Sequence, residues 1–266
     1  MHALARPVVA ATALLAGLAA PVGAGTFELL ADTLTTESGS QTVVARGHVR
    51  VTDGVSVARA GSARYTARAG RLVLSGGVVV QTPDGTLSAR EVTILLGRGQ
   101  RMDFFAAVGG VQVKARTRVF NAERVTYEPP TASLHASGAV TAFIPPDLYV
   151  SGHDLAANLR NEVATLTGHV RVRAAEGFIE GDRLDADGRA QTAFIHDHVV
   201  GGFRKTLVTA DTATLRAREH TAVFRGRVKI VDPTRTVTAD QVTVYYRDGR
   251  VIAEGTTSVR LEEDRP

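Results

Sequence analysis

The sequence predicts an all-β protein: an elongated antiparallel sheet of about 16 strands, folded on itself and built from eight copies of one repeat with a period near 29. Three observations predict it. The chain is rich in Val, Ala, Thr and Arg, contains 26 Gly and lacks Trp, a mixture that favours short strands and tight turns. One Gly position recurs along the chain at an almost fixed spacing, and apolar residues alternate with polar ones around each copy. No helix signal of useful length follows Ala24.

The N-terminal segment, 1–24, is expected to be a signal peptide that is cleaved on export. Arg6 supplies the positive charge, the stretch 8–20 is small or apolar with one Thr, and Val22-Gly23-Ala24 forms a small-residue cleavage site. The apolar run is short for a membrane span of about 20 residues, although a retained single-pass anchor stays open as an alternative. The rest of the chain, 25–266, is expected to form a single repeat domain.

One position, here called the repeat glycine, recurs so that the numbers of successive copies differ by 29, 33, 29, 30, 29, 29 and 29. Seven of the eight repeats carry Val two positions later, and all carry an apolar residue two positions earlier. The sixth repeat has Asp at this position, and Asp tolerates unusual backbone angles better than most residues. The eight positions are Gly47, Gly76, Gly109, Gly138, Gly168, Asp197, Gly226 and Gly255.

A small residue precedes each repeat glycine at a fixed interval, as Ala31 precedes Gly47; the third repeat has a longer interval, with extra residues near 97–100. The apolar alternation slips here: Val237 and Ala239 share one parity, whereas Val242 and Val244 share the other. A bulge or bend would return both sets to one inner face, and the mid-strand glycine predicts a second bend. The small residues are Ala31, Ala60, Ala89, Ala122, Gly152, Gly181, Ala210 and Ala239, and Asp follows four of them, as Asp32, Asp182, Asp211 and Asp240.

Asp-Gly pairs separate the two strands of several repeats and predict tight hairpin turns. They are Asp53-Gly54, Asp84-Gly85, Asp187-Gly188 and Asp248-Gly249. A parallel β-helix would also explain the fixed period, but these turns favour antiparallel pairing. A transmembrane barrel fits the strand number, yet the outward positions are polar and no aromatic girdle is present.

The repeat unit resembles that of the OstA/LptA family. The clearest copies are Ala239-Asp240-Gln241-Val242-Thr243-Val244 with Gly255, and Ala210-Asp211 with Gly226-Arg227-Val228-Lys229-Ile230. The resemblance covers essentially all of the chain after the signal peptide. It implies a twisted, V-shaped β-jellyroll in the periplasm that takes part in lipopolysaccharide transport and outer-membrane biogenesis in a Gram-negative cell.

The resemblance also implies partners. Lipid A acyl chains would lie in the apolar interior, and edge strands would pair with further copies and with transport components at the inner and outer membranes. Eight repeats are many for the stand-alone bridging protein. An LptC-like, membrane-anchored component is an alternative within the family if the N-terminal segment is retained. An exported structural or adhesive repeat protein with a dry core is the alternative from another class.

The candidate lipid-binding residues are the inward apolar side chains with the most apolar area. From the residues alone, a dry core in which they pack on one another is the simpler interpretation. The resemblance favours a groove that admits lipid. These residues are Leu74, Val78, Phe105, Val111, Leu166, Val170, Ile195, Phe224, Val228 and Ile230.

Nothing in the sequence predicts an enzyme, a cofactor, a metal or a nucleic-acid partner. The chain has no Cys, no nucleophile elbow and no phosphate loop before a helix, and its formal charge of +4 is spread along the chain. His196-Asp197-His198 resembles half of a zinc site; alternation places both His side chains on one outward face, where a solvated pair is expected.

Outward basic residues and the two ends of the sheet are the remaining candidates for contacts. Basic side chains could meet lipid phosphates at a groove mouth or simply keep the outer face solvated. The first and last repeats, 27–51 and 239–260, would leave unpaired edges that invite strand addition, unless the acidic tail at 262–266 blunts the last one. The outward basic residues are Arg46, Arg50, Arg171, Arg173, Arg227 and Lys229.

Overall fold

A computed structural model describes residues 27–37, 39, 41–97, 102–174, 177–203, 205–245 and 249–261. Within these ranges the chain forms 18 strands and one short 3-10 turn, η2 (Ala67–Ala69). The predicted all-β class with antiparallel pairing is confirmed. In the same ranges, no helix has the length and hydropathy to cross a membrane. The expected signal peptide lies outside the described residues.

The strands are named in chain order. They are β1 (Glu28–Leu30), β2 (Thr33–Glu37), β3 (Thr42–Thr52), β4 (Val57–Thr66), β5 (Arg71–Thr82), β6 (Gly85–Leu96), β7 (Met102–Ala115), β8 (Arg118–Glu128), β9 (Ser133–Ile144), β10 (Leu148–Asn158), β11 (Val163–Ala174), β12 (Gly177–Asp187), β13 (Thr192–Phe203), β14 (Thr206–Arg216), β15 (Thr221–Asp232), β16 (Arg235–Tyr245), β17 (Arg250–Glu254) and β18 (Ser258–Leu261).

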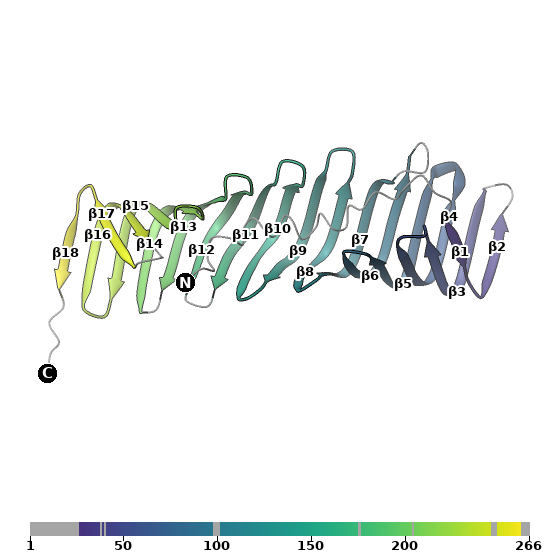
Figure 1. Cartoon of the computed structure of the whole chain (residues 1–266), viewed down its shortest axis with the longest axis horizontal. Helices are drawn as coiled ribbons and strands as arrows, with labels where there is room; N and C mark the ends of the chain where they lie inside the picture. The colour runs from purple at the N-terminus through teal and green to yellow at the C-terminus, as the bar shows by residue number, and fades with distance from the viewer. Residues whose placement is uncertain are drawn as a thin grey trace. The chain divides into compact units, whose positions relative to one another are not determined.

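The described residues fall into two compact units. The N-terminal unit contains residues 27–140 together with Ala156–Arg160, and the C-terminal unit contains Thr141–Leu155 and the residues from Asn161 onward. In the N-terminal unit, β3 to β8 pair in chain order, and in the C-terminal unit β11 to β16 do the same (Figure 1). The expected single domain over 25–266 stays a prediction.

Each of these long strands is interrupted near its middle by a bulge. Between β3 and β4 the register passes from Arg46 opposite Ser62 to Val49 opposite Ala60, so two residues on β3 oppose one on β4. Corresponding shifts occur between β5 and β6 and between β15 and β16. The slip in alternation that the sequence predicted is therefore confirmed as a bulge.

The bulge turns the apolar side chains of both strand halves toward one interior. On β6, Ala89 and Val92 are both buried, although a regular strand would place residues three positions apart on opposite faces. In the C-terminal unit the Phe224 ring, before the bulge on β15, lies 3.4 Å from the point where a Cβ on Gly201, after the bulge on β13, would stand. The two halves therefore pack face to face, as layers of a sandwich do.

In the seven repeats that carry Gly at the repeat position, the residue after the small residue, here called the facing residue, lies against the repeat glycine of the same repeat. A Cβ added to Gly226 would collide with the carboxylate of Asp211, and one added to Gly47 would collide with Asp32. The repeat glycines also have φ between +75° and +87°, a region that side chains with a Cβ rarely adopt. The lack of space for a Cβ and the positive φ therefore both favour Gly at this position. The other facing residues with their glycines are Gly61 with Gly76, Arg90 with Gly109, Glu123 with Gly138, His153 with Gly168, and Asp240 with Gly255.

The predicted hairpin turns form where the Asp-Gly pairs stand. Asp53 Oδ1 accepts hydrogen bonds from the backbone N–H groups of Val55 and Ser56, at 2.9 and 2.6 Å. Asp187 Oδ1 accepts one from the Ala190 N–H at 2.8 Å. Asp248 and the extra residues of the third repeat at 98–100 lie outside the described residues.

The first and last strands are each split in two, which is why 18 strands are described where about 16 were expected. β1 and β2 both pair with β3, and β17 and β18 both pair with β16. The breaks fall at 31–32 and 255–257, where the longer strands bend. β1 and β2 form one end of the N-terminal unit, and β17 and β18 form one end of the C-terminal unit. Among the described residues, each of these four strands pairs with a neighbouring strand on one side only.

Candidate functional site

The ten candidate lipid-binding residues all lie on the inner faces of the bent strands. The structure brings Leu74, Val78, Phe105 and Val111 together in the N-terminal unit. Nine of the ten are buried, and Phe105 is half-buried. The six in the C-terminal unit are Leu166, Val170, Ile195, Phe224, Val228 and Ile230.

Side chains that are buried to this extent form a closed interior. Leu74, Val78 and Val111 have 0% of their surface exposed, so neither water nor a methylene chain reaches them in this conformation. Burial also raises the pKa of Tyr127, near the C-terminal end of β8, and the positive charge of Arg160 lowers this pKa by a smaller amount. A lipid chain would have to part the two layers, or enter from an end, to contact the central side chains.

The terminal strands carry the exposed part of the apolar interior. In the C-terminal unit, Val251 and Val259 lie opposite Val244 and Val237, on the inner face, yet their exposed fractions are 51% and 62%. In the N-terminal unit, Leu34 lies opposite the buried Ala45 and is 52% exposed. Each described unit therefore ends in an apolar inner row that no further strand covers within the described residues.

Charged side chains line the outer side of the bends in pairs with a constant sequence separation of 16. Arg227 Nη2 lies 2.6 Å from Asp211 Oδ1, His198 Nδ1 lies 2.7 Å from Asp182 Oδ2, and His48 Nδ1 lies 2.8 Å from Asp32 Oδ2. In the last repeat, Asp240 accepts a hydrogen bond from the backbone N–H of Thr256 at 2.8 Å. The aspartates of the repeat signature therefore secure the residue that follows the repeat glycine.

His196 and His198 have separate partners. The bulge between His196 and Val199 interrupts the alternation that would have placed both rings side by side. His196 Nε2 lies 2.8 Å from Asp185 Oδ2, whereas His198 bonds Asp182. In the described ranges, no cluster of three or more His, Cys, Asp or Glu could hold a metal ion.

Asp185 is the centre of a hydrogen-bond network on the outer face of β11 to β13. Partial burial raises the pKa of this carboxyl, but hydrogen bonds from Thr165, Arg183 and His196 outweigh that effect and the pKa is lowered. The Thr165 Oγ1 donates at 2.6 Å and the Arg183 Nη2 at 2.9 Å. The network joins three strands, β11, β12 and β13.

All three outward arginines named from the sequence in the C-terminal unit have partners within the fold. Arg171 Nε lies 3.0 Å from Glu180 Oε1, and the Arg173 guanidinium carbon lies 5.1 Å from the centre of the Tyr149 ring. Arg227 pairs with Asp211. Arg46, in the N-terminal unit, differs because it borders a hollow on the outer face.

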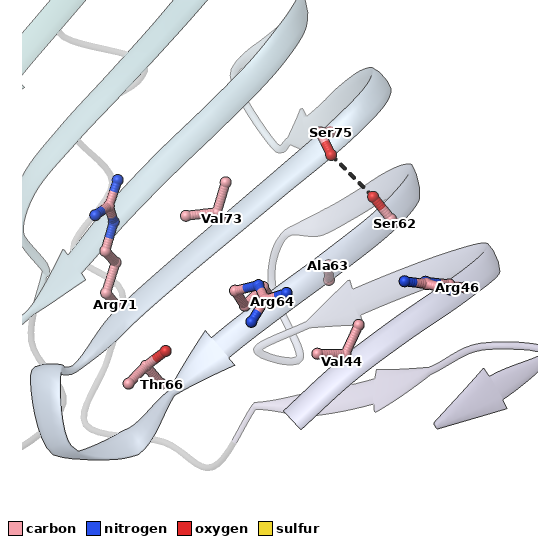
Figure 2. Close-up of a pocket in the computed structure, with 9 residues that line it drawn as sticks. All are labelled: Val44, Arg46, Ser62, Ala63, Arg64, Thr66, Arg71, Val73 and Ser75. Carbon is pink, nitrogen blue, oxygen red and sulfur yellow. Dashed lines mark hydrogen bonds between the residues drawn. The ribbon is translucent and has the colours of Figure 1, made fainter. Parts of the chain in front are cut away.

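This hollow, the outer hollow, has a volume of about 390 Å³ and lies over β3, β4 and β5. Figure 2 shows the side chains of Arg46, Arg64 and Arg71, one from each strand, together with the hydrogen bond that joins Ser62 and Ser75. Sequence reasoning missed all of these residues except Arg46. The strand register, which aligns them on one face, was the signal that could have found them. The remaining lining residues are Val44, Ala63, Thr66 and Val73.

Comparison with known proteins assigns part of the chain. Residues 207–265 match the family described as LptA/(LptD N-terminal domain) LPS transport protein. This segment contains both of the clearest repeat copies, so the resemblance to the OstA/LptA family is confirmed over it. No curated protein matches the chain.

A solved structure among those that match is similar to part of the chain. It is the crystal structure of LptH, the LptA homologous periplasmic component of the conserved lipopolysaccharide transport device from Pseudomonas aeruginosa. The identity is 14%, the alignment covers 46% of this chain and 96% of that chain, and the TM-score is 0.39.

Proposed function

We propose that this chain is a periplasmic lipopolysaccharide-transport protein of the LptA/OstA type. It would hold the lipid A acyl chains between the two layers of its bent strands and would catalyse no reaction. The observation that carries the proposal is the family match over residues 207–265, because that segment is built from the same repeat as the rest of the chain.

The geometry supports a lipid site that opens at the terminal strands. The inner rows are made mainly of Val, Ala, Leu, Ile and Phe side chains, which offer an acyl chain apolar contacts. The exposed inner residues Val251 and Val259 extend this surface to the end of the C-terminal unit. Entry from the end costs less than parting the buried centre, because fewer packed contacts are lost.

Site-specific photocrosslinking tests the lipid site. A photoreactive residue at Val259, which is inward and exposed, should crosslink to lipopolysaccharide in cells. A probe at Leu207, which is 49% exposed but faces outward, is the matched control. Probes at the buried Val170 and Phe224 extend the test inward, with Arg171 and Arg227 as outward controls. Equal labelling of inward and outward positions would contradict the proposal.

We further propose that the terminal strands join copies of this chain end to end and connect it to transport components at the two membranes. β2 and β18 present backbone groups with pairing on one side among the described residues, and exposed apolar residues flank them. A strand added at either edge would cover the backbone groups and the exposed apolar residues there. The LptC-like alternative differs in keeping its N-terminal segment, so N-terminal sequencing of the exported protein separates the two forms.

The alternative of a structural or adhesive repeat protein rests on the same buried core. The complete burial of Leu74 and Val78 is what a dry sandwich would give as well. The two functions differ in what the interior holds in the cell. Lipid extraction and mass spectrometry of the purified protein should therefore find bound lipopolysaccharide for a transporter and none for a structural protein.

A further inference from the structure

The outer hollow lies on the face of β3 to β5 that points away from the apolar interior. Its floor includes the backbone side of the buried Ala63, and its walls are arginine, serine, threonine and valine side chains. An acyl chain held in the interior of this unit lies on the opposite side of the sheet. A ligand in the hollow would therefore occupy a site separate from the interior.

Arg46, Arg64 and Arg71 form a diagonal across three neighbouring strands. Arg46 lies opposite Ser62, two positions from Arg64, and Arg64 lies opposite Val73, two positions from Arg71. Such diagonal neighbours lie roughly 7–8 Å apart, so Arg64 is within reach of a group that either neighbour contacts, whereas Arg46 and Arg71 stand two strands apart. Figure 2 shows Arg64 between the other two, with Arg46 and Arg71 on opposite sides of it.

The three arginines share a feature that separates them from several arginines elsewhere on this protein. In the part of the chain that the structure describes, none of them makes a salt bridge or a hydrogen bond to a side-chain carboxylate or amide. By contrast, Arg59, on the same strand as Arg64, donates to Gln81 Oε1 at 2.7 Å. Among the described residues no carboxylate lines the hollow; Glu37 and Glu91 occupy its borders in the register, opposite Thr42 and Ser75.

Hydroxyl groups complete the lining. Ser62 Oγ and Ser75 Oγ lie 2.8 Å apart, so one donates to the other and the second hydroxyl hydrogen remains available to a ligand. Thr66 adds a third hydroxyl, in contact with Thr42 at 3.4 Å. Planar guanidinium forks beside hydroxyl donors match the oxygens of a phosphate group, which accepts several hydrogen bonds and carries up to two negative charges.

We infer that the outer hollow binds a phosphate group, which the guanidinium groups of Arg46 and Arg64 hold together with the hydroxyls of Ser62 and Ser75, while Arg71 adds positive charge at the far side of the hollow. The bound anion relieves the mutual repulsion of three like charges on neighbouring strands. The phosphate belongs either to a soluble phosphorylated molecule or to a lipid headgroup. The site is independent of the proposed lipid interior, because it uses the other face of the sheet.

Titration of the full chain with inorganic phosphate tests the site directly. Backbone amide resonances of residues 62–64 and 75 should shift saturably with phosphate and not with sodium chloride at equal ionic strength. Arg64→Gln should lower the affinity roughly tenfold or more, because a hydrogen-bonded charge is lost. Arg59→Gln removes the same charge from the same strand beyond the bend, and it should leave the affinity unchanged. Circular dichroism checks that each variant folds, and Arg46→Gln provides a second variant.

Vesicles separate the two sources of phosphate. Binding to phosphatidylcholine vesicles that contain phosphatidic acid, displaced by inorganic phosphate and lost in Arg64→Gln, assigns the group to a lipid headgroup. Binding of inorganic phosphate without vesicle binding assigns it to a soluble ligand. Shifts that sodium chloride reproduces, or an equal loss of affinity in Arg59→Gln and Arg64→Gln, would overturn the inference.

Discussion

Arg227 and Asp211, with a sequence separation of 16, form an ion pair of 2.6 Å on the outer side of a bend. The preceding repeat places His198 beside Asp182 in the same way, at 2.7 Å. The two pairs affect one another: His198 contributes to the lowered pKa of Asp211, and Arg227 opposes the rise in the pKa of His198. The bends of successive repeats therefore carry a row of coupled charges.

Replacing Arg227 with Gln should raise the pKa of Asp211 toward its ordinary value, because the hydrogen bond from Arg227 is the largest cause of its depression. A depressed carboxyl pKa stabilises the fold above the ordinary value, and the contribution is lost as pH falls through the lowered value. NMR titration of the Asp211 carboxyl measures the shift. Arg225→Gln, which removes a cation that bonds Gln241, is the control and should leave the Asp211 pKa nearly unchanged.

Gly226→Ala should destabilise the C-terminal unit by about 1–3 kcal/mol through backbone strain, with a further cost from the collision with Asp211. Gly77→Ala is the control, because Gly77 has φ +79° but open space where its Cβ would stand. Chemical denaturation followed by circular dichroism compares the two. Equal losses of unfolding free energy would show that the facing residue adds nothing to the requirement for Gly.

His198 should titrate above the ordinary histidine pKa of 6.5, because Asp182 hydrogen-bonds the ring and attracts its charge. The stabilisation is fully present below the ordinary value and is lost as pH rises through the raised one. Asp182→Asn should lower the pKa of His198 in an NMR titration. Asp185→Asn, which removes the partner of His196, should not; a comparable drop would contradict separate partners for the two rings.

Leu74→Ala should cost about 2–5 kcal/mol of unfolding free energy, because Leu74 is fully buried and its loss leaves a cavity. Val79→Ala, on the outward face of the same strand, should cost much less. Hydrogen exchange of β4 to β6 is the suitable measurement, since repeat arrays open in parts rather than in one step. Similar exchange in both variants would contradict a packed interior at this position.

Val259→Lys should weaken self-association, because it places a charge on the exposed inner row of a terminal strand. Leu207→Lys introduces the same charge on the outward face of β14, away from either end, and should leave association unchanged. Sedimentation velocity over a range of protein concentrations measures both. An unchanged distribution in Val259→Lys would argue against assembly through the C-terminal strands.

Much of the fold could be predicted because the repeat makes each rule visible several times. The slip in parity between Ala239 and Val242 is a weak signal in one repeat, but its recurrence required a bend at a fixed place. The split of the terminal strands could not be predicted, because it depends on having a hydrogen-bonded neighbour on one side only. No local sequence feature at Asp32 or Gly255 marks that difference.

The site was less accessible from sequence. The alternation of apolar and polar residues identified which apolar residues point inward, such as Val170. It could not show how deeply they are buried, because that depends on how the two halves of each bent strand pack on one another. The outer hollow was missed because Arg46, Arg64 and Arg71 have no common spacing in the chain. Only the register of three strands places them on a common diagonal.

The facing residue and the repeat glycine that it contacts belong to the same repeat. The third repeat shows that this contact tolerates a longer connection between the two strands. Extra residues lengthen its connection, yet Arg90 still lies against Gly109 as Asp211 lies against Gly226. Length changes are thus absorbed by hairpin loops and leave the bends intact. A duplicated repeat would contain both residues of its own bend contact, and a lost repeat would remove both. Such a chain can therefore change its length through the number of repeats alone.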